Sequence, residues 1–399
     1  MNKIVIGFLT VLMSLTASAK DITLSVQAVN GLAQVRRDEP VVIDIAKYRV
    51  HSARVICNGV VVPCQLDDMD GDLVPDELVF MADVPASGKS TYIVTLSDTI
   101  QSITYTPRVY GALILSDRGG NYPHIAALEA PGASYLFNDV YQHGAVFESE
   151  LTAYRVYFDQ RQNVDLYGKS QRRIELPVTH FYTTAEQMAE GYGNDVLWAG
   201  NSIGAGTFKL WNGSNLVQWD NVVTRGQRII SAGPVRTVVE LIDKGVVTPS
   251  GIRVNVRQHY IIYAGHRDCS VTAWIEGNKT DYVTGVQKIG ASAVGFVDAA
   301  KGLAASWGSD YPDMGKKELY PQEAVGLAVC VSRDNIVSAK TDELNYLFVV
   351  TPNRNKTINY NISFCADKEH NGFHSADEWF KSLEEWKLLL DNPVKITIK

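Results

Sequence analysis

Short strand-forming runs, repeatedly broken by turn residues, are the feature of this sequence that most restricts its fold. Runs of five to eight residues rich in Val, Ile, Thr and Tyr alternate with Gly, Asn, Asp and Pro along most of the chain. This spacing is typical of antiparallel sheets, because each strand is short and a few turn residues reverse the chain. Clear runs lie at residues 91–96, 235–242, 252–263, 270–276 and 346–350. The sequence therefore predicts an all-β protein.

Helix signals are few, and the clearest lies near the C-terminus. Ser375 and Glu378 form a capping box, the side-chain pattern that begins a helix. Apolar residues then recur at helical spacing and form one stripe able to pack on a sheet: Trp379, Phe380, Leu383, Trp386 and Leu390. We expect a large β-sandwich or supersandwich with a short C-terminal helix. Residues 20–105 are expected to form an N-terminal β-sandwich portion and residues 106–399 the main supersandwich portion, unless the two are one continuous domain.

Residues 1–19 have the pattern of a secretory signal peptide. Lys3 supplies the positive start, residues 4–15 the apolar run, and Ala-Ser-Ala at 17–19 the cleavage pattern. The apolar run is too short to remain across a bilayer, so we expect a periplasmic or secreted protein without a membrane anchor. The net charge of −7 argues against nucleic acid as a partner. Five widely spread cysteines form no disulfide framework, and buried free thiols are expected.

The stretch from residue 143 to residue 169 carries the densest set of functional side chains. Successive side chains of a strand alternate between its two faces. One set is apolar and fits a core: Tyr154, Val156 and Phe158. The other set is charged or phenolic: Arg155, Tyr157, Asp159 and Arg161. Fixed donors beside a phenol and a carboxylate suit recognition of a polyhydroxylated or anionic ligand, whereas a salt-bridged outer face is the alternative interpretation.

Two kinds of sugar chemistry fit this stretch. A glycosidase needs two carboxyl groups across the scissile bond, one of them with a raised pKa. Glu148 or Glu150, paired with Asp159 or Asp165, would supply such groups.

The second chemistry is β-elimination on a sugar that carries a carboxylate. It needs a cation to neutralise that carboxylate, a base to take the neighbouring proton and an acid for the leaving oxygen. Arg155 or Arg161, His143 and Tyr157 fit these three roles, and the residue types alone do not choose between hydrolysis and elimination.

Further side chains in or near this stretch are expected to contact the sugar. They are Glu150, Asp165, Tyr167, Lys169, His180 and Trp198. The tryptophan is included because apolar sugar faces stack on aromatic rings.

An acidic loop places carboxylates at positions one, three, five and nine: Asp68, Asp70, Asp72 and Asp76. Calcium prefers such hard oxygen ligands, so the loop is a candidate for a structural calcium ion. An EF-hand is excluded, because Leu73 and Val79 stand where that motif needs Gly and Glu. A turn rich in Asp, leading into a strand, is the alternative interpretation.

Four passages and the Trp-rich C-terminal segment resemble the domain of unknown function 4861 family. The passages are QLDDMDGDLVPDELVF (65–80), HGAVFESELTAYRVYFDQRQNVDLYGK (143–169), GNDVLWAGNSIGAG (193–206) and SAGPVRTVVEL (231–241). The resemblance implies a secreted protein of Bacteroidetes glycan-utilisation loci with a β-supersandwich, galactose-mutarotase-like architecture. It implies no activity and therefore no catalytic residues. Leu73 departs from the Gly expected in the acidic loop of that family.

Taken together, we expect a periplasmic carbohydrate-active enzyme. Its partner would be an oligosaccharide or polysaccharide fragment containing uronic acid, cleaved by hydrolysis or β-elimination, with calcium as the one candidate cofactor. Two alternatives stay open: a non-catalytic glycan-binding or accessory protein of a polysaccharide-utilisation system, and a mutarotase-like sugar epimerase.

Overall fold

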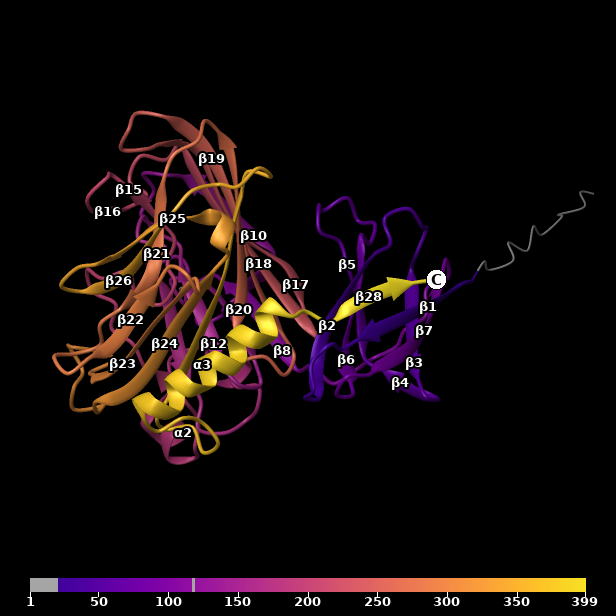
Figure 1. Ribbon diagram of the computed structural model, residues 1–399. Coiled ribbons are helices and arrows are strands. Elements are labelled where there is room, and N and C mark those ends of the chain that lie inside the picture. The colour runs from indigo at the N-terminus through magenta and orange to yellow at the C-terminus, as the bar shows by residue number, and fades with distance from the viewer. Residues whose placement is uncertain (1–20, 117–118) are drawn as a thin grey trace, which may run out of the picture.

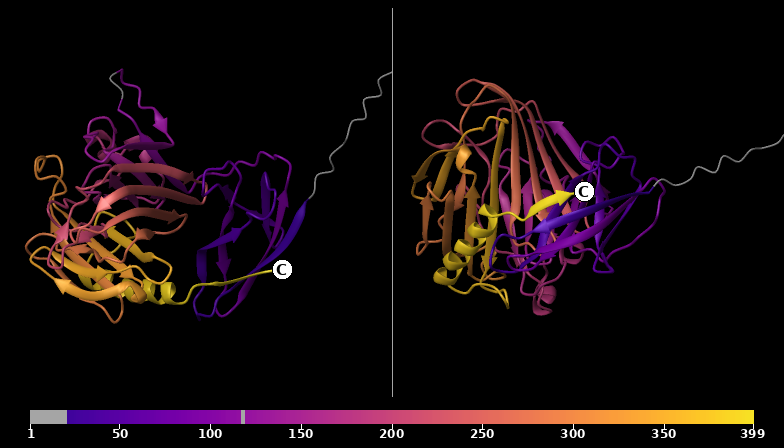
Figure 2. Two further views of the ribbon diagram at one scale, coloured as in Figure 1. Left: turned by 90° about the horizontal axis from the view of Figure 1, so that it is seen from above. Right: turned by 45° about the vertical axis from the view of Figure 1, so that its right-hand side comes forward.

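A computed structural model describes residues 21–116 and 119–399, so the expected signal peptide lies outside the described residues. The chain forms antiparallel sheets and little helix, which confirms the all-β sandwich class (Figure 1). An N-terminal sandwich stands beside a larger body, and Figure 2 shows the two from further sides.

Two sheets build the N-terminal sandwich. The first contains, in spatial order, β28 (Lys395–Ile398), β1 (Ile22–Val29), β7 (Lys89–Ser97), β3 (Ser52–Cys57) and β4 (Val60–Val62). The second contains β2 (Arg36–Asp44), β6 (Glu77–Val84) and β5 (Cys64–Asp67). Buried side chains such as Val26, Val41 and Phe80 fill the space between them.

The larger body is built on a sheet of nine strands. Its order is β10 (Ala127–Pro131), β17 (Thr224–Ala232), β18 (Arg236–Val247), β19 (Arg253–Tyr263), β20 (Cys269–Gly277), β27 (Thr357–Ala366), β24 (Glu323–Val331), β23 (Leu303–Asp310) and β22 (Val294–Asp298). The hairpin of β19 and β20 turns at residues 264–268, in agreement with the strand pattern of the sequence.

Two smaller sheets pack on the nine-stranded sheet. One contains β14 (Asn194–Asp195), β13 (Val164–Gly168), β12 (Ala153–Tyr157), β11 (Gly144–Ser149), β8 (Val109–Ile114) and β9 (His124–Ile125). The other contains β16 (Leu216–Val217), β15 (Lys209–Trp211), β21 (Tyr282–Gln287), β26 (Asn345–Val350) and β25 (Ile336–Thr341). One large apolar cluster joins all three sheets, with Tyr154, Tyr260 and Tyr282 each coming from a different one.

The strand β12 alternates as its sequence predicts. Tyr154 and Val156 are buried in the core between the sheets, whereas Arg155 and Tyr157 point from the opposite, outer face of the six-stranded sheet. Residues 170–193, with the short helices α1 (Leu176–Thr179) and α2 (Ala185–Ala189), cover part of that outer face. Leu176 and Phe181 anchor this cover on the sheet.

The C-terminal segment contains the predicted helix and one strand that was not expected. The helix α3 (Ala376–Asp391) begins at Ser375, whose side chain accepts a hydrogen bond from the Glu378 backbone N–H. Its residues Trp379 and Leu383 are buried against β23 and β24, and the 3-10 turn η1 (Arg333–Asn335) directly follows β24 in the chain. The chain then crosses to the N-terminal sandwich, where β28 pairs with β1 (Figure 1).

Polar contacts fasten the N-terminal sandwich to the larger body. The Asp67 carboxylate accepts a hydrogen bond of 2.8 Å from Nε of Arg236, and both side chains are buried. Arg108 bridges Asp38 of the sandwich and Glu150 of the larger body, with hydrogen bonds of 2.6 and 2.8 Å.

The cysteines agree with the expectation of buried free thiols. Cys57, Cys64, Cys269, Cys330 and Cys365 are all free thiols, and all but the half-buried Cys57 are buried. Among the residues that the structure describes, no helix is both long and apolar enough to cross a membrane.

Candidate functional site

A pocket opens on the outer face of the six-stranded sheet, where β12 and β13 meet the turn between them. Its volume is about 280 Å³, at the small end of the range for ligand pockets and sufficient for one sugar ring. Six of the residues predicted from the sequence line it: His143, Arg155, Tyr157, Arg161, Asp165 and Trp198.

Arg155 forms the floor of the pocket and is only 2% exposed. It lies directly across from Asp165 in the β12–β13 register, and its Nη2 donates to that carboxylate. Nη2 also donates to the hydroxyl of Tyr157 at 2.8 Å, and Nη1 donates to the hydroxyl of Tyr182 at 3.2 Å. Rings of Tyr157 and Phe181 lie 4.6 and 4.2 Å from the guanidinium carbon. Arg155 therefore holds the other groups of the floor in place.

A second carboxyl group, Asp195, lies beside Asp165. Its Oδ2 is 3.4 Å from Nη2 of Arg155, and 29% of its side chain is exposed to the pocket. Burial and the adjacent Asp165 carboxylate raise the pKa of Asp195 well above its ordinary value, against the opposing effect of Arg155. The pair therefore holds a proton at a pH where a free aspartate has lost it. This makes Asp195 a candidate proton donor.

His143 supplies a neutral imidazole on the pocket wall. Its Nδ1 lies 2.6 Å from the Phe137 carbonyl oxygen, which can only accept, so Nδ1 carries the proton and Nε2 keeps its lone pair. The ring stacks on Phe137 with a centroid distance of 3.6 Å. Burial lowers the pKa of His143, and the nearby Arg155 and Arg161 cations lower it further. The imidazole is therefore a candidate proton acceptor.

The rim of the pocket carries a cation and an exposed indole. Arg161 lies on the turn after β12 and not on the strand itself, yet its guanidinium carbon lies 5.1 Å from the ring centre of Tyr157. Asp159 holds it through a hydrogen bond of 2.7 Å to Nε and also accepts from the Arg161 backbone N–H. Trp198 keeps half of its surface exposed. Lys316 and Asp313 also line the rim.

The buried Lys209 supports this turn from below. Its Nζ donates to the Arg161 carbonyl at 2.5 Å, to Oδ1 of Asn163 at 2.8 Å and to Oε1 of Gln218 at 2.7 Å. Burial lowers the pKa of Lys209 to about 7. Three acceptors around one amine favour its three-proton form, so we describe it as an ammonium that fixes the position of the turn.

Other predicted residues lie outside the pocket lining. Glu148 is fully buried beneath residues 170–193, where it accepts hydrogen bonds from Nζ of Lys169 and from the backbone N–H groups of Glu175 and Leu176. Tyr167 lies on the same covered part of the sheet and donates to Glu175 at 3.0 Å. These groups anchor the segment that covers the sheet.

Three further predicted residues take supporting positions. Glu150 joins Arg108 at the contact with the N-terminal sandwich. Asp159 lies behind Arg161, and His180 lies outside the pocket lining, with its ring 6.1 Å from that of Tyr141.

The pocket residues that the sequence interpretation missed include Phe137, Tyr182, Asp195 and Lys316. Asp195 lies within the passage GNDVLWAGNSIGAG, and its place beside β13 follows from the Tyr167–Asp195 pairing. The two-residue strand β14 is too short to be read from an alternating pattern, so the register that places Asp195 in the pocket was not visible.

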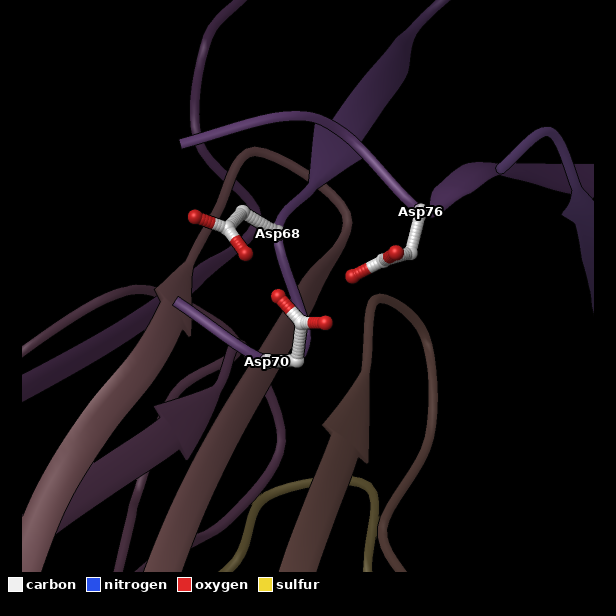
Figure 3. Close-up of side chains that lie close together, drawn as sticks. All are labelled: Asp68, Asp70 and Asp76. Carbon is white, nitrogen blue, oxygen red and sulfur yellow. The ribbon is translucent and has the colours of Figure 1, made fainter. Parts of the chain in front are cut away.

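The acidic loop brings three of its four carboxylates together (Figure 3). Oxygens of Asp68, Asp70 and Asp76 lie within 4.8 Å of one another, whereas Asp72 is outside this group. Both oxygens of Asp68 already accept backbone hydrogen bonds, from Gly71 at 2.6 Å and Leu73 at 2.8 Å. The oxygens that converge fit the donor preference of calcium, and the backbone bonds fit a turn without metal. Calcium binding here stays a prediction.

The chain belongs to the family described as "Domain of unknown function (DUF4861)", whose profile matches residues 29–396. No protein with a curated description matches it in sequence. Two solved structures from Enterococcus faecalis show a remote likeness. One is a protein in the glycosyl hydrolase family 38, with 8% identity, a TM-score of 0.45, and coverage of 94% of this chain and 47% of the other. The other is an alpha-mannosidase, with 7% identity, a TM-score of 0.43, and coverage of 94% and 46%. The chain thus spans about half the length of either protein.

Proposed function

We propose that this protein is a carbohydrate-active enzyme whose active site is the pocket at the ends of β12 and β13. One observation carries the proposal: His143, whose pKa is lowered by burial, and Asp195, whose pKa is raised by burial and by the adjacent Asp165, share a pocket of single-sugar size. Opposite protonation states of this kind are what general base and general acid catalysis need at one pH.

The arrangement favours β-elimination on a uronic-acid residue over hydrolysis. The carboxyl groups of Asp165 and Asp195 both lie on Arg155 and interact directly, so they cannot stand on either side of a glycosidic bond. Glycosidases separate their two carboxyl groups by about 5 Å or more for that purpose. Elimination needs a base, an acid and a cation, and His143, Asp195 and Arg161 of the pocket could supply these three groups.

In the proposed reaction Arg161 pairs with the carboxylate of the sugar. Nε2 of His143 takes the proton from the carbon next to that carboxylate. The electron pair forms a carbon–carbon double bond while the bond to the neighbouring glycosidic oxygen breaks. Asp195 gives its proton to the leaving oxygen, and Tyr157, which donates to Asp165 at 3.1 Å, keeps the acid group in position. The predicted signal peptide would place this reaction in the periplasm or outside the cell.

A sugar epimerase resembling mutarotases is the second candidate. The size of the pocket favours it, because an acid and a base around a single sugar ring suffice to open and close that ring. This activity would interconvert anomers without breaking a glycosidic bond, so optical rotation distinguishes it from both cleavage reactions.

The test is a screen of the purified protein on uronic-acid oligosaccharides, read by absorbance of unsaturated products and by new reducing ends. Elimination gives both signals, and hydrolysis gives only the second. His143→Gln and Asp195→Asn should abolish product formation, whereas Asp334→Asn, an exposed carboxylate outside the pocket, should leave it unchanged. Glycan binding without any product would leave a glycan-binding protein instead of an enzyme.

A further inference from the structure

A row of aromatic side chains runs outward from the pocket on the side of Tyr182. The ring centroid of Tyr182 lies 5.9 Å from that of Tyr141, which in turn lies 4.1 Å from that of Tyr122. Tyr182 is 40% exposed and Tyr122 is 44% exposed. Tyr141 comes from the turn before β11, Tyr122 from the loop between β8 and β9, and Tyr182 from the segment after α1. Three separate segments therefore converge to make the row.

A second row of aromatic side chains extends from the pocket and begins at Phe137, which stacks on His143. The imidazole stacks on Phe137, whose ring centroid lies 6.1 Å from that of Tyr135. Tyr135 is 75% exposed. The imidazole also lies 6.2 Å from the ring of Tyr182, so it connects the two rows. His143 therefore stands in the middle of one continuous aromatic arc, with Tyr122 and Tyr135 at its ends.

Exposed aromatic rings are costly to leave in water, and grouped around a polar pocket they mark a ligand surface. A pyranose ring is about as wide as a phenol ring, and its apolar face stacks on such a ring. Each row holds more than one aromatic side chain, so the arc is longer than the single sugar that the pocket holds. A substrate that used the whole arc would extend from the pocket in both directions.

We infer that the substrate is a polysaccharide or long oligosaccharide that lies along this arc and is cleaved within the chain. This inference rests on the proposed function and adds its substrate class. The sugar in the pocket is the one that reacts, and its neighbours on either side contact Tyr182, Tyr141 and Tyr122 or Phe137 and Tyr135. The bond that is cleaved, next to the sugar in the pocket, then lies inside the substrate chain and not at its end.

The experiment compares substrates of increasing length. Affinities are measured by calorimetry with galacturonic acid, with mannuronic acid and with a length series of oligomers of each, in the Asp195→Asn background to prevent turnover. Affinity should rise with length. Tyr122→Ala and Tyr135→Ala should each weaken binding of the longest oligomers about tenfold, the loss expected for one stacked ring, and leave the monomers unaffected. Tyr48→Ala, a tyrosine of the N-terminal sandwich, is the matched control.

Product analysis supplies the second arm. With Asp195 intact, early digestion of a polymer should release fragments of many lengths, and the two tyrosine variants should raise KM for the polymer. Release of terminal sugars alone, with affinity independent of length, would overturn the inference and leave the proposed activity standing. Length-dependent binding without any product would keep the extended surface and remove the proposed activity. Failure of every sugar to bind would remove both.

Discussion

Two clusters of charged side chains lie on the outer face of the six-stranded sheet, and they differ in what covers them. Lys169 and Glu148 lie under residues 170–193 and are closed off from solvent. Arg155, Asp165 and Asp195 lie further along the same face, where the cover ends and a pocket begins. Glu148 comes from β11 and Lys169 directly follows β13, whereas the second cluster comes from β12, β13 and β14, and both clusters pair basic with acidic side chains. The comparison teaches that the strand pattern assigns a side chain to a face, but the loops above that face decide whether it anchors structure or meets a ligand.

The largest expected effect is the loss of activity when residues of the pocket are substituted. Asp195→Asn and His143→Gln should each lower kcat by about 10²–10⁴-fold, the range for removal of a general acid or base. The melting temperature should stay within a few degrees of the parent, because neither side chain fills the core. Steady-state kinetics and a thermal scan measure the two quantities, and unchanged turnover in both variants would contradict the assignment of the pocket.

The dependence of activity on pH examines the same pair without mutation. His143 acts as a base only when deprotonated, and its lowered pKa makes it available below the ordinary range for histidine. Asp195 acts as an acid only while protonated, and its raised pKa extends that form upward. Activity should therefore rise with pH through the histidine and fall through the aspartate, giving a bell-shaped profile of kcat/KM. If the activity of the wild-type protein rises with pH and does not fall again at alkaline pH, this would argue against Asp195 as the acid.

The covered cluster should respond in stability instead of chemistry. Lys169→Met leaves the Glu148 carboxylate buried without its cation, which costs about 3–5 kcal/mol of the free energy of unfolding. Denaturant unfolding measures this loss. The double variant Lys169→Met/Glu148→Leu is the matched control and should recover most of it, because no buried charge is then left unpaired. A single variant as stable as the parent would show that the cluster is not an anchor.

Lys209 connects the two behaviours, since it is buried but supports the rim of the pocket. In Lys209→Met, the turn that carries Arg161 loses the hydrogen bonds that the Lys209 ammonium donates to it. KM should therefore rise about tenfold, equivalent to about 1.4 kcal/mol, with a smaller change in kcat. Lys209→Arg should restore part of the effect. Equal losses in both variants, together with a large fall in melting temperature, would indicate a purely structural role.

Calcium should have the smallest effect, and it would act at the loop between β5 and β6 of the N-terminal sandwich. At a free concentration about ten times its Kd, calcium would add about 1.4 kcal/mol to the free energy of unfolding. Asp70→Asn should remove that gain, whereas Asp72→Asn should keep it, because Asp72 stands outside the converging carboxylates. Thermal scans with calcium and with a chelator compare the three proteins. If calcium does not shift the melting temperature, the loop is better interpreted as a turn without a metal ion.

The sequence alone predicts the sheets, the helix at Ser375 and the outward face of β12, because these follow from local periodicity and capping. It also indicates the floor of the pocket, since Arg155 pairs with Asp165 across adjacent strands and Tyr157 donates to the same carboxylate. It does not separate Glu148 from these, because the segment that buries Glu148 follows it in the chain by more than 20 residues and shows no strand pattern. Tyr182 reaches the pocket through loop conformation and Asp195 through a strand of only two residues, and periodicity encodes neither.

The return of the chain to its starting sheet affects how the protein is assembled. Because β28 pairs with β1, the outer edge of β1 stays unpaired until residues 395–398 are in place. An unpaired border of this kind is a template for another chain. Removal of residues 395–399 would leave the pocket intact but expose β1, and the shortened protein should self-associate or aggregate.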